Sequence, residues 1–251
     1  MKLPSHTWLK GSWPPEVVIM AGVHGNEQAG VTALKEFLES PFASQLKKNV
    51  LFIFANPRAH EKNVRFTETD LNREFGVFSE SYEGKRAREI ASMLGTAKVL
   101  IDLHQTQAPT QEPFVGSIKH PQSVAFLQRM QIPVSQFVVI GNINPGNMSS
   151  DEYFISVHPE SVALTFECGS IVGSQEKVVA LGKDIIIEAL HCSGALGTIE
   201  KRKDRKINFW TVKQSVPRAP QTQLVSELKN FSTLKKGQII AYENGTEIRC
   251  L

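Results

Sequence analysis

The chain has 251 residues, 41% of them hydrophobic, and a formal net charge of +3 at pH 7. This length is enough for one large hydrophobic core and a small second one. Three widely separated cysteines, Cys168, Cys192 and Cys250, exclude a small disulfide-stapled domain and favour a reducing compartment. No run approaches the roughly 18 apolar residues of a membrane span, and residues 1–8 lack the apolar core of a signal peptide. The sequence therefore predicts a soluble, cytoplasmic protein with no membrane partner.

A basic cluster at residues 200–206 holds five Lys and Arg side chains in seven positions. Acidic residues interrupt this cluster and no aromatic residue lies within it, which is typical of a solvated turn rather than of a nucleic-acid surface. A mild positive charge is enough to attract small anionic molecules. We therefore expect no nucleic-acid partner and a small anionic substrate.

Short apolar or β-branched runs alternate along the chain with longer segments whose apolar residues recur at helical spacing. Continuous apolar strands are typical of a largely parallel sheet covered by helices on both faces. The repeated order strand–helix–strand predicts an α/β domain. The predicted strands are residues 17–20, 50–55, 98–102, 137–140 and 162–166, and the predicted helices are residues 27–38, 84–94, 122–130 and 175–190.

The composition and periodicity of the sequence change after residues 193–197, where charge clusters, prolines and short alternating segments replace the helical patterns. Asn244-Gly245 lies between two apparent strands and predicts a hairpin turn. We therefore divide the chain into an α/β catalytic domain, residues 1–193, and a small β-rich domain, residues 194–251. Strands are predicted in the second part at residues 198–200, 208–212 and 238–242.

Two histidines and a glutamate follow predicted strands. His24 and Glu27 come just after the first strand, and His104 comes after the third, so all three are expected at the carboxyl edge of the sheet, where α/β sheets bind ligands. Two imidazoles and one carboxylate form a typical catalytic zinc set, in which water takes the fourth position and its pKa falls from about 15.7 towards about 7. The alternative for His24 and Glu27 alone is a pair of exposed residues at a helix start.

Polar residues follow the second and fifth predicted strands as well. The segment between Asn56 and Arg73 carries two arginines eight residues apart, Arg65 and Arg73, and a guanidinium group matches the planar shape of a carboxylate. The alternative is an ordinary polar loop with surface ion pairs. Glu167 ends the fifth strand, and a carboxylate placed there is costly unless it is paired or functional.

Together these segments resemble the succinylglutamate desuccinylase and aspartoacylase family, a branch of the zinc carboxypeptidase-like hydrolases. The resemblance implies a zinc-carboxypeptidase-like α/β fold, with a mixed, largely parallel sheet flanked by helices. The matching pieces occur in family order: His24-Gly-Asn-Glu27, Asn56-Pro-Arg-Ala59, Arg65, Asp70-Leu-Asn-Arg73, Asp102-Leu-His104 and Glu167-Cys-Gly169.

The resemblance also implies roles for the site residues. One zinc ion per chain would be held by His24, Glu27 and His104. Glu167 would be the general base that takes a proton from water and later delivers it to the leaving amine. Arg65 stands at the position that the family uses to polarise the scissile carbonyl.

Three further residues complete the expected site. Asn72 and Arg73 match the family's pair for the substrate carboxylate, and binding that carboxylate would fix the amide for attack. Asp70 is expected to orient His24, because metal-binding histidines usually donate their other N–H to a carboxylate or carbonyl. Residues 147–153 are expected to form a loop, either over the site or elsewhere.

One departure from the family bears on the substrate. Aspartoacylases of the mammalian type carry an additional arginine upstream of the catalytic glutamate, and residues 156–166 contain none. N-acetylaspartate is therefore not the expected substrate. The sequence predicts a zinc-dependent deacylase of N-acyl amino acids, such as N-succinyl or N-acetyl amino acids. A carboxypeptidase-like peptidase acting on short peptides and a non-catalytic zinc-binding relative are the alternatives, and homo-oligomerisation is left open.

Overall fold

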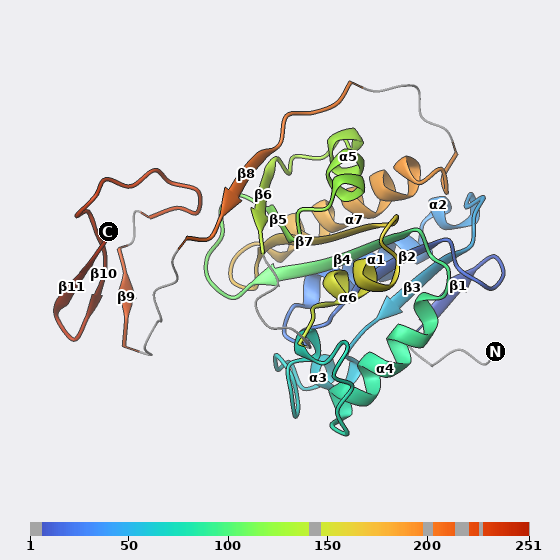
Figure 1. The fold of residues 1–251 in the computed structure, drawn as a ribbon, viewed down its shortest axis with the longest axis horizontal. Coiled ribbons are helices and arrows are strands. Elements are labelled where there is room, and N and C mark those ends of the chain that lie inside the picture. The colour runs from blue at the N-terminus through green and yellow to red at the C-terminus, as the bar shows by residue number, and fades with distance from the viewer. Residues whose placement is uncertain (1–6, 141–146, 198–202, 214–220, 226–227, 251) are drawn as a thin grey trace.

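The computed structural model describes residues 7–140, 147–197, 203–213, 221–225 and 228–250. Its main feature is an eight-stranded sheet in the order β1-β3-β2-β4-β7-β5-β6-β8 (Figure 1). The sheet is largely parallel, since only the pairs β1–β3 and β5–β7 run antiparallel. Its strands are β1 (Thr7–Lys10), β2 (Val17–Ala21), β3 (Val50–Phe54), β4 (Val99–Thr106), β5 (Phe114–Ser117), β6 (Gln136–Val139), β7 (Val162–Ser170) and β8 (Asn208–Thr211).

Helices cover both faces of this sheet, which explains why β2 and β3 are apolar at every position. In β2, Val17, Ile19 and Ala21 pack into one core cluster, and Val18 and Met20 into another. The first cluster lies under α1 (Gln28–Glu39), α5 (Pro121–Arg129) and α7 (Gln175–Cys192), and the second under α4 (Tyr82–Leu94) and α6 (Ser150–Val157). The expected α/β architecture is confirmed. The remaining short helices are α2 (Pro41–Ser44), α3 (Pro57–Glu61) and the 3₁₀ turn η1 (Leu71–Arg73).

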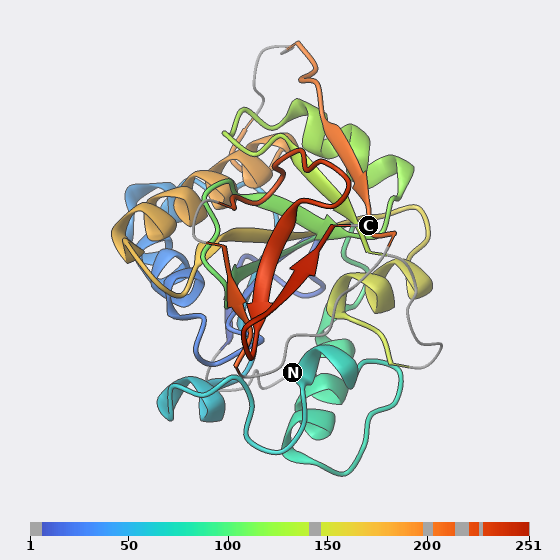
Figure 2. The same cartoon turned by 90° about the vertical axis from the view of Figure 1, so that its left-hand side faces the viewer.

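A second, three-stranded antiparallel sheet lies near the C-terminus, beside the main body (Figures 1 and 2). It contains β9 (Gln223–Leu224), β10 (Ile239–Glu243) and β11 (Thr246–Arg249). The predicted hairpin is confirmed, because Glu243 pairs with Thr246 and both Asn244 and Gly245 have positive φ, as a tight turn of this kind requires.

The strand predicted at residues 208–212 takes a different place from the one its position in the sequence suggested. It forms β8 and pairs with β6 at the edge of the large sheet. The predicted strand at residues 198–200 lies outside the described residues, and the domain boundary after residue 193 stays a prediction. Within the described part of the chain, no helix is long and apolar enough to cross a membrane.

Two elements near the cavity were not predicted. Residues 147–153 were expected to be a loop, but α6 begins at Ser150. Ser149 and Glu152 form a capping box at its start, a four-residue pattern that was visible in the sequence. The four-residue strand β5 lies in a segment rich in polar residues and proline, where neither helical nor strand periodicity stands out.

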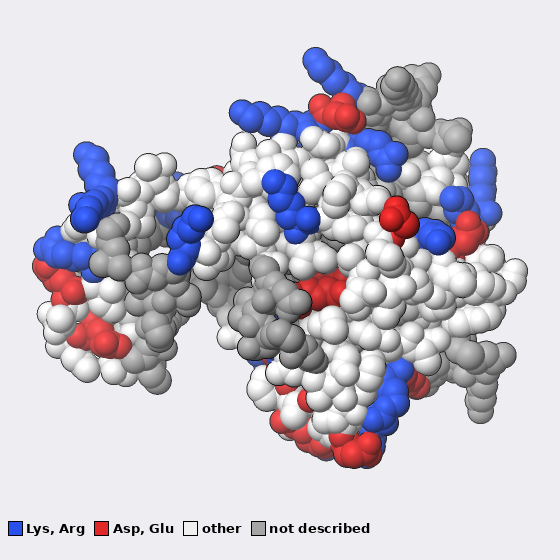
Figure 3. Space-filling view, viewed as in Figure 1, with Lys and Arg blue, Asp and Glu red and all other residues white. Residues whose placement is uncertain are grey.

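Basic side chains do not form one patch on the face drawn in Figure 3, where Lys and Arg are spread among neutral and acidic residues. Within the described part of the basic cluster, Arg205 is not a solvated charge. Its guanidinium donates to the backbone carbonyls of Leu127, Ile132 and Val134, around the end of α5. This arginine therefore contributes to the local fold.

Candidate active site

The three predicted metal ligands meet at the carboxyl edge of the sheet. His24 lies three residues after β2, Glu27 directly precedes α1, and His104 lies within β4, which extends further than predicted. All three side chains are buried, and their ligand atoms lie within 4.8 Å of one another. The two imidazole rings meet edge to face, with centroids 5.0 Å apart.

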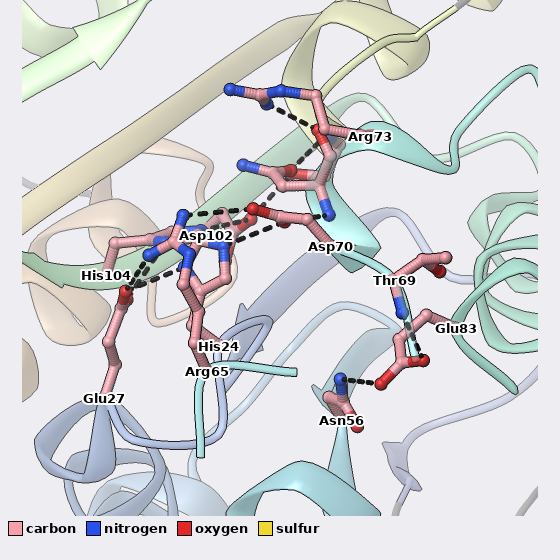
Figure 4. A network of polar contacts seen from close by, with 12 residues as sticks. His24, Glu27, Asn56, Arg65, Thr69, Asp70, Arg73, Glu83, Asp102 and His104 are labelled. Carbon is pink, nitrogen blue, oxygen red and sulfur yellow. Dashed lines mark hydrogen bonds and ion pairs between the residues drawn. The ribbon is translucent and has the colours of Figure 1, made fainter. Parts of the chain in front are cut away.

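The Glu27 carboxylate contacts both rings (Figure 4). Its Oε1 is 2.7 Å from Nδ1 of His24, and its Oε2 is 3.0 Å from Nδ1 of His104. The backbone N–H of Gln105 also donates to Oε2, at 2.9 Å. Burial raises the pKa of Glu27, but His104 and His24 more than offset this and lower it to about 2. The carboxylate is therefore ionised at neutral pH.

The other nitrogen of each ring faces an aspartate. His24 Nε2 is 3.1 Å from Oδ1 of Asp70, and His104 Nε2 is 3.1 Å from Oδ2 of the fully buried Asp102. Carboxylates in this position fix the orientation of histidines whose opposite nitrogens bind a metal ion. The two Nδ1 atoms and Glu27 therefore form a donor set that fits a divalent cation.

Asp102 was not predicted to contact His104, although both belong to the matching piece Asp102-Leu-His104. The signal was available, since residues i and i+2 of a strand point to the same face of a sheet. An aspartate two residues before a candidate metal ligand on a strand is therefore placed to contact it.

Arg65 and Asp70 lie together beside this cluster. Arg65 reaches Oδ2 of Asp70 at 3.2 Å with one terminal nitrogen and Oε1 of Glu27 at 3.5 Å with the other. Burial raises the pKa of Asp70, but His24 and Arg65 reverse the effect and hold it well below its usual range. Asp70 thus connects the ring of His24 to Arg65, whose side chain is still 34% exposed and lines the cavity.

Glu167 lies on β7 directly opposite His104 of β4 in the parallel register. Its Oε2 is buried and has no hydrogen-bond partner among the described residues. Burial raises the pKa of Glu167 to about 7, against the lowering effect of His104. An unpartnered carboxyl oxygen with a pKa near neutrality, in a cavity, is typical of a group that transfers protons.

A cavity joins these groups to the predicted carboxylate-binding pair. Asn72 Oδ1 accepts from the backbone N–H of Ser150, so the side-chain amide remains as a donor. Arg73 is exposed and donates to the carbonyl of Asn72. The cavity is lined by His24, Arg65, Asn72, Arg73, His104, Gly116, Ser117, Ile118, Ile140, Asn147, Ser149, Asp151, Glu152, Thr165 and Glu167.

Several other polar residues do not line this cavity. Gln105 is buried beneath α1, where its Oε1 accepts from the N–H of Ala29. Glu112 is exposed and bonds to Gln136. His60, His120, His158 and His191 also lie outside the cavity lining.

Comparisons with known proteins identify relatives of this chain. Residues 14–190 match the model of the succinylglutamate desuccinylase/aspartoacylase catalytic domain. An N-acyl-aromatic-L-amino acid amidohydrolase (carboxylate-forming) of Xenopus tropicalis is 40% identical over 104 residues, which cover 36% of this chain and only about a third (34%) of that protein. A succinylglutamate desuccinylase of Serratia proteamaculans is 24% identical over 263 residues, covering 96% of this chain and 78% of its own length.

Solved structures show the same fold. The succinylglutamate desuccinylase of Chromobacterium violaceum aligns with a TM-score of 0.68 at 24% identity, covering 90% of this chain and 76% of that one. A succinylglutamate desuccinylase from Silicibacter sp. aligns with a TM-score of 0.75 at 18% identity, covering 97% and 79%. The family model spans most of this chain, and the solved structures share the fold of this chain. The chain therefore belongs to the succinylglutamate desuccinylase/aspartoacylase family.

Proposed function

We propose that the protein is a zinc-dependent amidohydrolase that removes the acyl group from an N-acyl amino acid. The observation that carries this proposal is the position of Glu167, whose unpartnered Oε2 lies in the same cavity as His24 and His104. A base, a metal-binding cluster and two arginines in one cavity are the groups that amide hydrolysis requires.

We assign one zinc ion per chain to Nδ1 of His24, the Glu27 carboxylate and Nδ1 of His104. Two nitrogens and one carboxylate are a common ligand set of catalytic zinc. A bound zinc ion supplies a lowered pKa for water and polarisation of the scissile carbonyl. Asp70 orients the ring of His24 by accepting from its Nε2–H group, and the Asp102 carboxylate orients the ring of His104 from 3.1 Å away.

Glu167 is the proton-transfer group in this proposal. It accepts a proton from the attacking water and delivers it to the nitrogen of the leaving amine, which is a poor leaving group without protonation. Its pKa of about 7 in the protein is close to the range in which one carboxyl group can both accept and donate a proton. A positive charge bound at the neighbouring cluster would lower this pKa and favour the ionised form.

The two arginines have separate tasks. Arg65 stabilises negative charge on the carbonyl oxygen as the tetrahedral centre forms, because it lines the cavity next to the metal-binding cluster. Arg73 and the side-chain amide of Asn72 bind the substrate carboxylate. Among the described contacts Arg73 uses one N–H for the carbonyl of Asn72, and a guanidinium has five.

The remaining cavity wall limits the charge of the substrate. Asp151 and Glu152, at the start of α6, both line the cavity. Burial raises the pKa of Asp151, so the Glu152 carboxylate is the group expected to repel a second negative charge on the substrate. Among N-acyl amino acids, we therefore expect those with one carboxylate and an uncharged acyl group, such as acetyl, to be preferred over N-succinyl amino acids.

Carboxypeptidase-like cleavage of a short peptide is the second candidate. The exposed guanidinium of Arg73 is equally suited to the C-terminal carboxylate of a peptide. A non-catalytic relative would have no need for Glu167 or Arg65, and both are present in the cavity.

The test combines metal analysis with an activity panel. Zinc is measured per chain in purified protein, and the same sample is assayed for amine release from N-acetyl, N-succinyl and N-formyl amino acids and from dipeptides. One zinc per chain with chelator-sensitive release from N-acyl amino acids supports the proposal. Release from dipeptides alone favours the peptidase, and no zinc on folded, zinc-supplied protein refutes the proposed metal site.

A further inference from the structure

The segment that brings Arg65 and Asp70 to the cavity has no regular secondary structure. Residues 65–70 lie between α3 and η1 and belong to no helix or strand. The backbone N–H groups of Thr67, Glu68 and Thr69 therefore cannot donate to the carbonyl groups of a helix or a sheet. Unpaired backbone groups are costly away from water, so another acceptor is needed.

Glu83 supplies that acceptor. Its side chain is fully buried at the start of α4, and Figure 4 shows it beside Thr69 and Asn56. Oε1 accepts from the N–H and the hydroxyl of Thr67, at 2.7 and 2.8 Å, and from Nδ2 of Asn56 at 3.3 Å. Oε2 accepts from the N–H groups of Glu68 and Thr69, at 3.1 and 3.2 Å.

The charge of Glu83 and the path of this segment depend on each other. Burial raises the pKa of Glu83, but the donors on Thr67, Thr69 and Asn56 more than offset it and leave the pKa below its usual value. Hydrogen bonds to an ionised acceptor are stronger than those between neutral groups. A buried carboxylate without these donors would be strongly unfavourable.

Helix α4 does not depend on Glu83 for its attachment to the sheet. Three residues later on the same helix, Arg86 donates to the carbonyls of Ala55 and Phe54 at the end of β3, at 2.7 and 2.8 Å. The distinctive contribution of Glu83 is therefore made to residues 67–69.

We propose that Glu83 is a positioning residue that fixes Arg65 and Asp70 against the His24–Glu27–His104 cluster by binding three consecutive amides of the segment between them. Loss of its charge releases the segment. Asp70 then no longer orients His24 firmly, and Arg65 no longer has a fixed place in the cavity. The catalytic part of this inference rests on the proposed function, but the structural and metal-binding parts do not.

Amide hydrogen exchange tests the structural part. In the wild-type protein the amides of residues 67–69 should be protected although they lie outside helices and strands. Glu83→Gln replaces one oxygen with an NH₂ group that faces N–H donors, and we expect these amides to exchange at least tenfold faster. Glu83→Asp, which keeps the charge, should retain part of the protection and serves if the glutamine variant fails to fold.

Arg86→Met is the matched control. It also alters a buried polar residue of α4, but Arg86 contacts the end of β3 and Glu89 on its own helix, and not residues 67–69. It should lower thermal stability and leave the protection of residues 67–69 in place. Equal exchange of these amides in wild type and in Glu83→Gln would overturn the inference.

A double-mutant cycle on zinc affinity tests the connection to the cluster. Glu83→Gln and Asp70→Asn should each weaken binding about tenfold or more, within the range found for residues that support metal ligands. If Glu83 acts through Asp70, the double variant should be little weaker than Asp70→Asn alone, whereas independent effects would multiply and contradict the inference. A wild-type protein that binds zinc but releases no amine would refute the proposed function and leave both of these measurements valid.

Discussion

Asp102 Oδ2 lies 3.1 Å from Nε2 of His104, and the hydroxyl of Ser150 donates to the same oxygen at 2.6 Å. The backbone N–H of Ser150 in turn donates to Oδ1 of Asn72. The first residue of α6 therefore joins the carboxylate that orients a metal ligand to the residue proposed to bind the substrate carboxylate. A continuous series of polar contacts therefore joins the two halves of the site.

Asp102→Asn should weaken zinc binding and reduce its dependence on pH. Burial lowers the pKa of His104, but the carboxylates of Asp102 and Glu27 reverse this and raise it well above its usual value. Zinc binding then requires His104 to lose a proton, so wild-type affinity should increase as pH rises. The variant should bind zinc about 10–100-fold more weakly at pH 8, and the deficit should narrow towards pH 6, because its His104 holds the proton less tightly.

Chelator-competition titrations at several pH values between 6 and 8 measure this effect. Asp184→Asn, on α7 and outside the cavity lining, is a suitable control and should match wild type. If the zinc affinities of wild type and Asp102→Asn changed equally with pH across this range, the role given to Asp102 would be contradicted.

Glu167→Gln should abolish most turnover and leave the zinc content near one per chain. The amide cannot accept a proton from water, and positioned proton transfer typically contributes about 10²–10⁴-fold to rate. His104→Ala should lose both zinc and activity, because it removes a ligand. Single-turnover rates and metal analysis on the same preparations separate the two cases, and a Glu167→Gln enzyme with a near-wild-type rate would refute the assigned base.

The sequence predicted much of the fold because the central strands are apolar on both faces. That pattern in β2, β3, β4 and β7 requires helices on either side, whatever the order of the strands. The order itself did not follow from the pattern. That His104 and Glu167 are register partners depends on β4 and β7 being neighbours, and 55 residues of chain lie between these two strands.

The supporting residues were harder to predict than the ligands. From the sequence, Glu83 is expected to be an exposed acid in the first turn of an amphipathic helix, where acidic residues are common. Its burial arises because residues 67–69 fold over it, and no local pattern in the sequence signals that contact. Ser150 was likewise assigned to a loop, although the capping box beginning at Ser149 marked the start of a helix.

Arg73→Ala and Arg65→Ala should have different kinetic effects. Arg73 is proposed to bind a carboxylate in the ground state and the transition state alike, so its loss should mainly raise KM. Arg65 is proposed to stabilise charge that appears only in the transition state, so its loss should mainly lower kcat. Steady-state kinetics on one substrate measure both, and changes of the same kind in the two variants would refute this division.

Substrate charge provides a further test. The kcat/KM for an N-acetyl amino acid with a neutral side chain should exceed that for its N-succinyl counterpart. Glu152→Gln should narrow this difference by about three- to tenfold, the effect of removing ~1 kcal/mol of like-charge repulsion at a partly exposed site. Glutamine also supports a capping box, so α6 should remain intact. An unchanged ratio between the two substrates would show that Glu152 does not select for charge.

Gly25→Ala should disrupt the metal cluster through backbone contacts alone. A Cβ atom at Gly25 would lie 2.1 Å from the carbonyl carbon of Ala59 and 2.2 Å from the backbone nitrogen of His60, so either α3 or the His24 turn must shift. We expect a loss of stability of about 1–3 kcal/mol or more, together with weaker zinc binding. Gly182→Ala is the control, because its Cβ would lie 2.9 Å from the Cβ of Ala33 at the α1–α7 contact, away from the cluster. Thermal unfolding and zinc content should show both variants destabilised and only Gly25→Ala impaired in zinc binding, whereas full zinc occupancy in Gly25→Ala would show that the turn can adjust without moving His24.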